Sequence, residues 1–288
     1  MSNDVSAPKS CHMFPGQGSQ KKGMGEGLFE RFPELTAQAD AILGYSIREL
    51  CIADPGEKLG LTQFTQPALY TVNALSYFAL LADGGAHPQF VAGHSLGEYN
   101  ALLAAGVFDF ATGLKLVQKR GALMSEAQGG GMAAVVGLDA DRVRAVLAEN
   151  SLSQIDMANL NTPTQIVISG PREAIQNAKP IFEAAGAGMY VPLNVSGAFH
   201  SRYMVESQTA FRAFLGGFGY AAPAIPVISN VEAQPYPADR TADLLAAQLT
   251  NSVRWVETIQ YLRRQGVAEF KEVGPGKVLS GLVRKIPA

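Results

Sequence analysis

The sequence predicts an α/β fold in which a large domain, built on a parallel sheet, carries an inserted ferredoxin-like unit. Strands alternate with helix-length segments over residues 1–128, which is typical of a parallel sheet with helices on both faces. Residues 129–195 have the order strand, helix, strand, strand, helix, strand, which is the ferredoxin-like order. The large-domain pattern returns in residues 196–288, so we expect two subdomains around a shared cleft.

In the large domain, short apolar runs indicate strands, and apolar residues at helical spacing indicate helices. The expected strands are 11–14, 90–93, 225–229 and 269–273. The expected helices are 28–50, 66–81, 96–105, 113–124 and 241–262. Between the first strand and the first helix, Pro15-Gly16-Gln17-Gly18 predicts a tight turn with exposed backbone amides.

The inserted unit begins at three glycines, 129–131, which we interpret as a hinge. Its expected strands are 132–138, 155–160, 165–169 and 189–195. Its expected helices are 139–149 and 171–185. The chain leaves this unit shortly before residue 200, so the segment that follows can line the cleft.

Composition argues against several classes of function. The net charge of −2 gives no field that attracts nucleic acid or an anionic membrane. The most apolar stretches, such as 101–108, are far shorter than the roughly 20 residues of a membrane span. The first ten residues are polar and contain no signal-peptide core. We expect a cytoplasmic monomer without a metal, in which Cys11 and Cys51 are reduced and have no metal-ligand spacing.

A candidate nucleophile lies in Gly93-His94-Ser95-Leu96-Gly97, which fits the pattern G-x-S-x-G. The expected strand ends at Gly93 and the expected helix begins at Leu96. The predicted strand-turn-helix setting therefore fits a nucleophilic serine, in addition to the sequence pattern. Glycines around Ser95 allow a sharp turn, and the helix N-terminus directs amides toward developing negative charge. The simpler alternative is that Ser95 only caps the helix.

A serine nucleophile needs a base, and histidine is the usual one because its pKa lies near neutrality. His12 is inside the first strand and His87 is in a polar loop. His94 is adjacent to Ser95, where neighbouring side chains diverge. His200, at the return from the small unit, remains as the candidate base, although a lone histidine is more often structural.

No acidic partner for the histidine is evident. Glu206, Asp239, Asp243 and Glu257 follow His200, but none lies in a recognisable motif and each is explained by surface charge. The residue pattern alone therefore leaves open which group orients the base.

Arg120 lies beside the apolar face of the expected helix 113–124. A solvated or ion-paired arginine is one interpretation, and the residue pattern slightly favours it. The other is a guanidinium that binds a substrate carboxylate through two parallel hydrogen bonds.

Seven segments, in order from residue 13 to the C-terminus, carry a family resemblance: Phe14-Pro15-Gly16-Gln17-Gly18-Ser19-Gln20, Thr65-Gln66-Pro67-Ala68, Gly93-His94-Ser95-Leu96-Gly97-Glu98-Tyr99, Lys119-Arg120-Gly121, Gln165-Ile166-Val167-Ile168-Ser169-Gly170, Ala198-Phe199-His200-Ser201 and Val273-Gly274-Pro275-Gly276-Lys277-Val278-Leu279. Together they resemble the malonyl-CoA:acyl-carrier-protein transacylases of fatty-acid synthesis and the acyltransferases of polyketide synthases. The resemblance implies a hydrolase-like large domain with a ferredoxin-like insert.

The resemblance also implies roles for individual residues. It makes Ser95 the nucleophile and His200 the base, and the backbone carbonyl that orients the base matches Gln248. Arg120 matches the arginine that binds the malonyl carboxylate, which reverses the preference stated above. The amides of the oxyanion hole match Gln17 and Leu96.

Two further residues are candidate substrate contacts, His94 and Phe199. Phe199 lies where the family tends to carry phenylalanine when malonate is the substrate, because bulk there crowds the branch methyl of methylmalonate. One methyl group is typically worth about 1–3 kcal/mol of discrimination, so a preference is implied and not an exclusion. Gly197 replaces the histidine often found at the start of this motif, which weakens the inference.

The function implied is transfer of malonyl from coenzyme A to the phosphopantetheine thiol of an acyl carrier protein. No cofactor is implied besides the coenzyme A thioester, which is the substrate. An acyl hydrolase of the same fold and a catalytically inactive carrier-protein docking module are the alternatives. The pathway is fatty-acid or polyketide synthesis, and the Gly-Ala-Phe-His variant favours a discrete, trans-acting polyketide enzyme.

Overall fold

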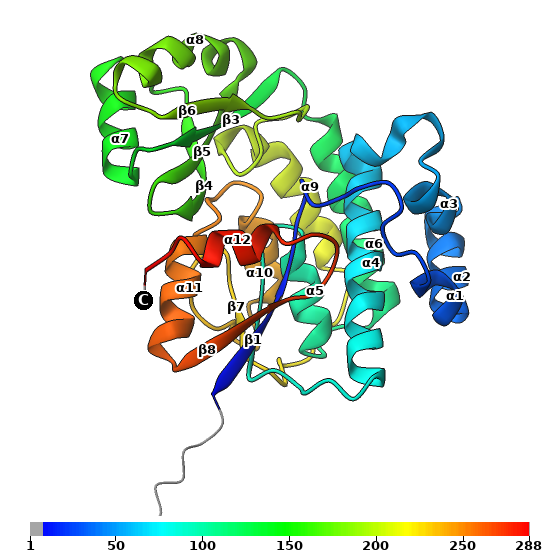
Figure 1. The fold of residues 1–288 in the computed structure, drawn as a ribbon. Coiled ribbons are helices and arrows are strands. Elements are labelled where there is room, and N and C mark those ends of the chain that lie inside the picture. The colour runs from blue at the N-terminus through cyan, green and yellow to red at the C-terminus, as the bar shows by residue number, and fades with distance from the viewer. Residues whose placement is uncertain (1–7, 288) are drawn as a thin grey trace, which may run out of the picture.

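The computed structural model describes residues 8–287 and contains two sheets (Figure 1). The larger sheet is parallel, with strand order β7-β2-β1-β8. Its strands are β1 (Lys9–Phe14), β2 (Phe90–Gly93), β7 (Val227–Ile228) and β8 (Val267–Glu272). The expected parallel sheet is therefore confirmed. Residues 1–7, most of the polar segment that argues against a signal peptide, lie outside the described residues.

Helices of the large domain cover both faces of the large sheet, and others pack on the outside of these. The helices of the large domain are α1 (Leu28–Arg31), α2 (Pro33–Leu43), α3 (Ile47–Ile52), η1 (Pro55–Gly60), α4 (Thr62–Ala82), α5 (Gly97–Ala104), α6 (Phe110–Glu126), η2 (Arg202–Met204), α9 (Val205–Leu215), α10 (Thr241–Ala247), α11 (Trp255–Arg264) and α12 (Val278–Val283). Helices α2 and α3, for example, pack on the outside of α4 and α6. Alternate strand residues face opposite ways. Phe14 and Val91 belong to the core formed with α4, α5 and α6, whereas Met13 and Ala92 pack against α11 and α12.

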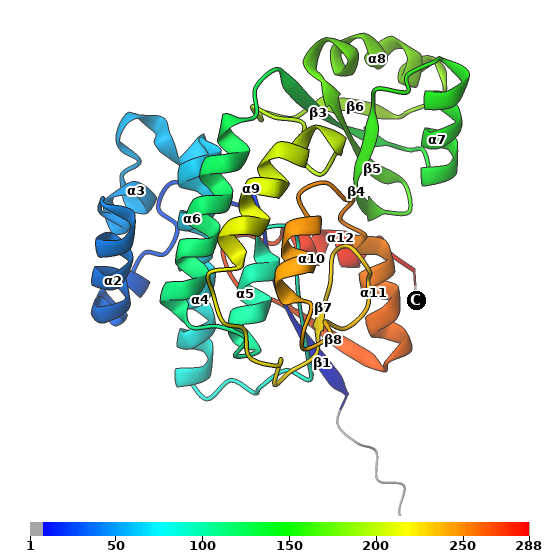
Figure 2. The ribbon, with the colours of Figure 1, turned by 180° about the vertical axis from the view of Figure 1, so that it is seen from behind.

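The smaller sheet is antiparallel, with strand order β4-β5-β3-β6, and lies at one end of the large domain (Figures 1 and 2). Its strands are β3 (Gly130–Val136), β4 (Asp156–Thr162), β5 (Gln165–Pro171) and β6 (Met189–Pro192). Helices α7 (Ala140–Glu149) and α8 (Arg172–Ala184) cover one face. This order confirms the ferredoxin-like unit, while its exact boundaries at 129 and 195 stay a prediction.

Some expected elements were wrong in extent. The single helix expected over 28–50 is three helices, because Pro33 starts a new helix and Gly44 ends it with a φ of +81°. The strand expected over 225–229 has two residues, and only one of the six residues of β8 is buried. Helices α9 and α12 were not predicted at all.

The helix expected over 241–262 is also wrong, and this error concerns the site. The chain forms α10 and α11 with a break at 248–254. Within the break, Val253 donates a backbone hydrogen bond to Ala158 and accepts one from Leu160, at 2.9 Å each. Pairing with β4 therefore replaces the helical hydrogen bonds that apolar spacing predicted.

Among residues 8–287, no helix is both long enough and apolar enough to span a bilayer.

The strand–helix packing around β1 makes one prediction about stability. A Cβ added at Gly97 would lie 1.9 Å from the Phe14 carbonyl oxygen, so Gly97→Ala forces β1 and α5 apart. We expect it to lower the free energy of unfolding by about 3 kcal/mol. The matched control is Gly281→Ala in α12, where a Cβ meets nothing within 4 Å, and which should stabilise by about 0.5–1 kcal/mol. Urea unfolding measures both, and equal effects would contradict the close packing.

Candidate active site

Ser95 occupies the turn between β2 and α5 and has a φ of +51°, which non-glycine residues rarely adopt. The turn is possible because two glycines flank it. A Cβ added at Gly93 would lie 1.9 Å from the carbonyl carbon of Gly97, and a Cβ added at Gly97 would lie 1.9 Å from the backbone oxygen of Phe14. The strained turn raises the Ser95 hydroxyl above the carboxyl end of the sheet.

His200 lies against this hydroxyl. Its Nε2 is 2.8 Å from Ser95 Oγ, and its Nδ1 is 2.8 Å from the backbone oxygen of Gln248. A carbonyl oxygen only accepts, so Nδ1 carries the proton and Nε2 can accept one from Ser95. Burial, followed by the Arg120 charge, lowers the pKa of His200 to about 3, so the imidazole is neutral at pH 7. The pair can activate Ser95 as a nucleophile.

The acidic candidates from the sequence do not reach His200. Among the described residues, no side-chain carboxylate hydrogen-bonds it. Asp243 and Glu257 each form an ion pair with an arginine on the surface, and Glu206 and Asp239 are exposed. The backbone oxygen of Gln248 is the group that orients the ring.

The Arg120 guanidinium is buried, with 1% of the residue exposed, and faces Ser95. Nη1 donates to Gln66 Oε1 at 2.8 Å. Nη2 donates to Gln248 Oε1 at 2.8 Å and to Ser95 Oγ at 3.0 Å. The Tyr99 ring stacks beneath it, with its centroid 5.7 Å from Cζ. A buried cation beside a nucleophile can bind an anionic group of the molecule that reacts there.

The predicted site residues come together around one pocket of about 90 Å³, with Gln248 against its inner wall. The pocket is lined by Gln17, Gln66, His94, Ser95, Leu96, Arg120, Met124, Met132, Asn159, Leu193, Val195, Phe199 and His200. Among residues 8–287, the backbone amides of Gln17 and Leu96 donate no hydrogen bond to the protein. Both amides are therefore available to an oxygen atom in the pocket.

His94 takes a different direction from Ser95, as expected in a sharp turn. Its Nε2 lies 2.7 Å from Asn161 Oδ1, and its ring packs edge-on against Trp255 at 5.5 Å between centroids. The ring also forms part of the pocket wall, so its contacts hold the wall in shape.

Three residues around the nucleophile were not assigned a role from the sequence. Asn230 accepts from the Ser95 amide and donates to the Gly93 oxygen, at 2.7 Å each. Glu98 is fully buried and accepts from the Asn230 amide at 2.7 Å. Burial raises the pKa of Glu98 to about 7, against the opposing hydrogen bonds. Glu98 and the third residue, Gln66, belong to two of the segments that carry the family resemblance. Asn230 lies just after the two-residue strand β7, and no sequence pattern points to it.

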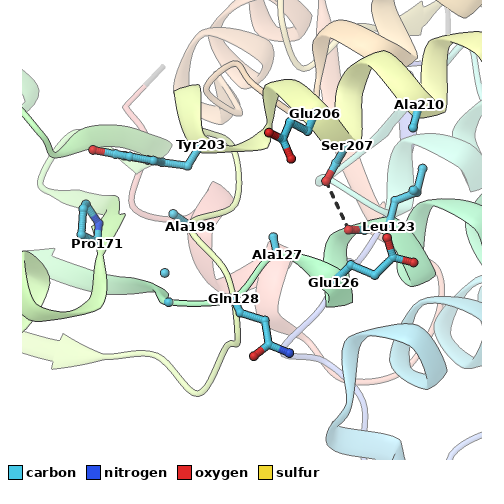
Figure 3. Close-up of a pocket in the computed structure, with 12 residues that line it drawn as sticks. Leu123, Glu126, Ala127, Gln128, Pro171, Ala198, Tyr203, Glu206, Ser207 and Ala210 are labelled. Atoms are coloured by element: carbon cyan, nitrogen blue, oxygen red, sulfur yellow. Dashed lines mark hydrogen bonds between the residues drawn. The ribbon is translucent and has the colours of Figure 1, made fainter.

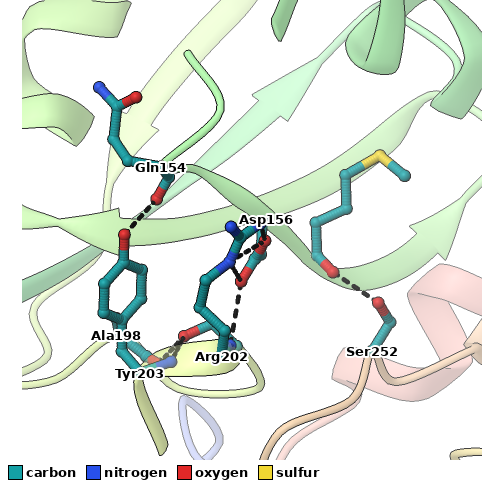
Figure 4. A network of polar contacts seen from close by, with 8 residues as sticks. Gln154, Asp156, Ala198, Arg202, Tyr203 and Ser252 are labelled. Carbon is teal, nitrogen blue, oxygen red and sulfur yellow. Dashed lines mark hydrogen bonds and ion pairs between the residues drawn. The ribbon is translucent and has the colours of Figure 1, made fainter. Parts of the chain in front are cut away.

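The small sheet holds the segments that carry the base and its orienter (Figure 4). Asp156 on β4 accepts from the backbone amide and Nε of Arg202, at 3.0 Å each. The Tyr203 hydroxyl donates to the Gln154 oxygen at 2.9 Å. Ser252, in the break after α10, donates to the Met157 oxygen at 2.5 Å. Strand β4 therefore fixes the chain on both sides of the His200–Gln248 contact.

A larger cavity, of about 540 Å³, lies beside the segment that connects α6 to β3 (Figure 3). It is lined by residues around Gly129 and near the start of α9, among them Gln128, Ala198, Tyr203 and Glu206. Neither Ser95 nor His200 lines it, so the larger volume is not where the reactive pair lies. No group of three or more His, Cys, Asp or Glu side chains among residues 8–287 is arranged to hold a metal ion.

Known acyl transferases resemble this chain over nearly its whole length. The acyl transferase domain family matches residues 11–285. The polyketide biosynthesis malonyl CoA-acyl carrier protein transacylase PksC of Bacillus subtilis is 56% identical, over 96% of both chains. The malonyl CoA-acyl carrier protein transacylase of Escherichia coli K12 is 41% identical, over 95% of this chain and 91% of that one. The chain also spans 36% of PksE, a longer Bacillus subtilis polyketide biosynthesis protein, at 56% identity.

Solved structures agree with the sequences. A malonyl CoA-acyl carrier protein transacylase from Burkholderia pseudomallei superposes with a TM-score of 0.95 at 54% identity, covering 98% of this chain and all of that one. A malonyl-transacylase solved in complex with its type II polyketide acyl-carrier protein has a TM-score of 0.92 at 38% identity, covering 96% and 93%. The match over nearly the whole chain confirms the resemblance seen in the sequence, and this protein belongs to the acyl transferase domain family.

Proposed function

We propose that this protein moves malonyl from coenzyme A to the phosphopantetheine thiol of an acyl carrier protein, through an ester on Ser95. The observation that carries the proposal is the buried Arg120, whose Nη2 lies 3.0 Å from Ser95 Oγ. A guanidinium at that distance can hold the free carboxylate of malonyl while its thioester carbonyl meets Ser95. A neutral acyl chain would leave the cation without an anionic partner.

In the first half-reaction, His200 Nε2 takes the proton of Ser95 as the oxygen attacks the thioester carbonyl. The carbonyl oxygen becomes negatively charged and accepts from the amides of Gln17 and Leu96. The C–S bond then breaks, coenzyme A leaves as the thiol with the proton from His200, and malonyl remains on Ser95. The Gln248 carbonyl stabilises the imidazolium that forms during each step.

In the second half-reaction, His200 takes the proton of the carrier thiol, whose sulfur attacks the ester. The malonyl group leaves on sulfur, and Ser95 recovers its proton from His200. No separate cofactor takes part in this cycle. The relative solved with its acyl-carrier protein supports such a partner for this chain.

Arg120 favours the transferase over the two alternatives. A hydrolase for neutral acyl chains has no use for a buried guanidinium at the nucleophile. An inactive docking module has no use for a Ser95–His200 contact of 2.8 Å. The 56% identity to the polyketide protein PksC, against 41% to the Escherichia coli transacylase, supports a polyketide context. Discrete action, a monomeric state and cytoplasmic residence stay predictions.

The covalent step is tested by intact mass after brief incubation with malonyl-CoA. Wild type should gain one malonyl group, and Ser95→Ala should gain none. Arg120→Ala should lower kcat/KM for malonyl-CoA by about 10–100-fold, the loss of a hydrogen bond to a charged group, with a smaller effect on acetyl-CoA. A wild type that gives no malonyl adduct under rapid quench, yet steadily hydrolyses acetyl-CoA, would instead be a hydrolase.

The lowered pKa of His200 predicts the pH dependence of Ser95 reactivity. The neutral imidazole is the base, and with a pKa of about 3 it stays neutral well below 6.5, the ordinary value. Labelling of Ser95 by a neutral phosphonate should therefore remain fast from pH 8 to about pH 5, while circular dichroism reports the folded state. Arg120→Met should shift the acid limb upward because it removes a neighbouring positive charge. Because the pKa of Glu98 is about 7, Glu98→Gln is the control that removes its titration. A labelling rate that falls with a midpoint near pH 6.5 in both the wild type and Glu98→Gln would contradict a buried, neutral base.

Phe199 makes a prediction about the acyl branch. It is 5% exposed and lines the pocket, and its ring lies against Gly197, where a Cβ would meet Phe199 Cε1 at 2.7 Å. Phe199→Ala should raise methylmalonyl-CoA turnover relative to malonyl-CoA by about tenfold, the scale of one methyl group. Phe214→Ala, a matched truncation on α9 outside the pocket, should leave the ratio unchanged. Competition assays with both thioesters measure it, and an unchanged ratio in Phe199→Ala would exclude Phe199 as the source of discrimination.

A further inference from the structure

A chain of buried polar side chains runs behind the pocket from Glu98 through Gln248 to Arg120. Glu98 and Gln248 are fully buried, and Arg120 is 1% exposed. Gln248 Nε2 donates to Glu98 Oε2 and, at 3.0 Å, to the backbone oxygen of Ser95. Gln248 Oε1 accepts from Arg120 Nη2 at 2.8 Å. The carboxylate and the guanidinium are thus connected through an amide and not by a direct ion pair.

The Gln248 amide has one orientation in this setting. Its nitrogen faces two acceptors, Glu98 and the Ser95 oxygen, and its oxygen faces a donor on Arg120. Turned by 180°, it would place its nitrogen against the guanidinium and its oxygen against both acceptors. All three hydrogen bonds would be lost in a buried site, where unpaired polar groups are costly. Glu98 therefore determines which end of the amide Arg120 meets.

The amide leaves part of the guanidinium unused. An arginine side chain has five N–H donors. Among the described residues, Arg120 donates three hydrogen bonds, to Gln66, Gln248 and Ser95. Nε is buried and has no partner among the described residues. A carboxylate in the place of the Gln248 amide would instead neutralise Arg120 from behind and compete with an incoming anion.

We propose that the Gln248 side chain is a spacer that keeps the buried Glu98 carboxylate one step away from Arg120, and that Glu98 fixes this spacer. Both are then positioning residues that set the selectivity for carboxylate-bearing acyl groups. This inference rests on the proposed function, in which Arg120 binds the malonyl carboxylate. It assigns to the Gln248 side chain a task separate from that of its backbone oxygen, which orients His200.

The decisive variant exchanges the two side chains, Glu98→Gln together with Gln248→Glu. Charge, size and total composition of the buried cluster stay the same, but the carboxylate now lies directly against Arg120. We expect kcat/KM for malonyl-CoA to fall on the order of 10–100-fold further than kcat/KM for acetyl-CoA, the scale of a hydrogen bond to a charged group. The measured quantity is the ratio of the two kcat/KM values, from rapid-quench acylation of Ser95.

Two further variants complete the experiment. Gln118→Glu is the control, because it adds a carboxylate to α6, the helix that carries Arg120, but away from the pocket. Gln118 donates to the Ile42 oxygen at 3.3 Å, and this variant should leave the ratio at the wild-type value. Glu98→Gln alone keeps the side-chain shape but weakens one of the three hydrogen bonds that orient the Gln248 amide, and should lower the ratio at least about fivefold. If the double exchange variant shows no cooperative thermal unfolding, Glu98→Gln alone tests the spacer proposal.

A wild-type ratio in the folded exchange variant, or in Glu98→Gln when the exchange variant does not fold, would overturn the spacer. Failure of the proposed function looks different. In that case the wild type itself forms no malonyl adduct, or Arg120→Ala keeps the full preference for malonyl-CoA. If Arg120→Ala loses the preference and the Glu98 and Gln248 variants keep it, the spacer alone is wrong.

Discussion

The buried guanidinium of Arg120 is the constraint on which the rest of the site depends. Removing an ion from water costs several kcal/mol even after the protein relaxes, so a folded state that contains one must supply polar partners for it. Here they come from segments far apart in the chain: Gln66 on α4, Ser95 and Tyr99 around α5, and Gln248 after α10. The same contacts that make the cation tolerable also bring the nucleophile, the base and its orienter to one place.

The parts of this arrangement that depend on neighbouring residues could be predicted from the sequence. Glycines at 93 and 97 around Ser95 specify a tight turn between a strand and a helix, and the structure has that turn. The ferredoxin-like unit was equally predictable, because its hydrophobic periods alternate between strand and helix in a short segment. His200 could be selected because only four histidines are present.

The parts that depend on distant residues could not be predicted from pattern. Apolar spacing over 241–262 indicates one helix, yet the chain breaks where Val253 pairs with β4, and the break exposes the Gln248 carbonyl to His200. Only the family resemblance pointed to Gln248. Asn230 carried no signal, because its task is to satisfy backbone groups of Ser95 and Gly93 that are more than 130 residues away in sequence.

The attachment of β4 to the segments around His200 and Gln248 limits how this family can be recombined. A unit joined to its host only by a hinge can be exchanged between relatives as a cassette. Here β4 hydrogen-bonds to Arg202 and Ser252, which lie outside the inserted unit. An insert taken from a relative would therefore meet partners for β4 that come from the host protein. A chimera cut near Gly129 would combine a β4 from one relative with the Arg202 and Ser252 segments of another. Functional crossovers should be those that keep β4 together with the loops it contacts.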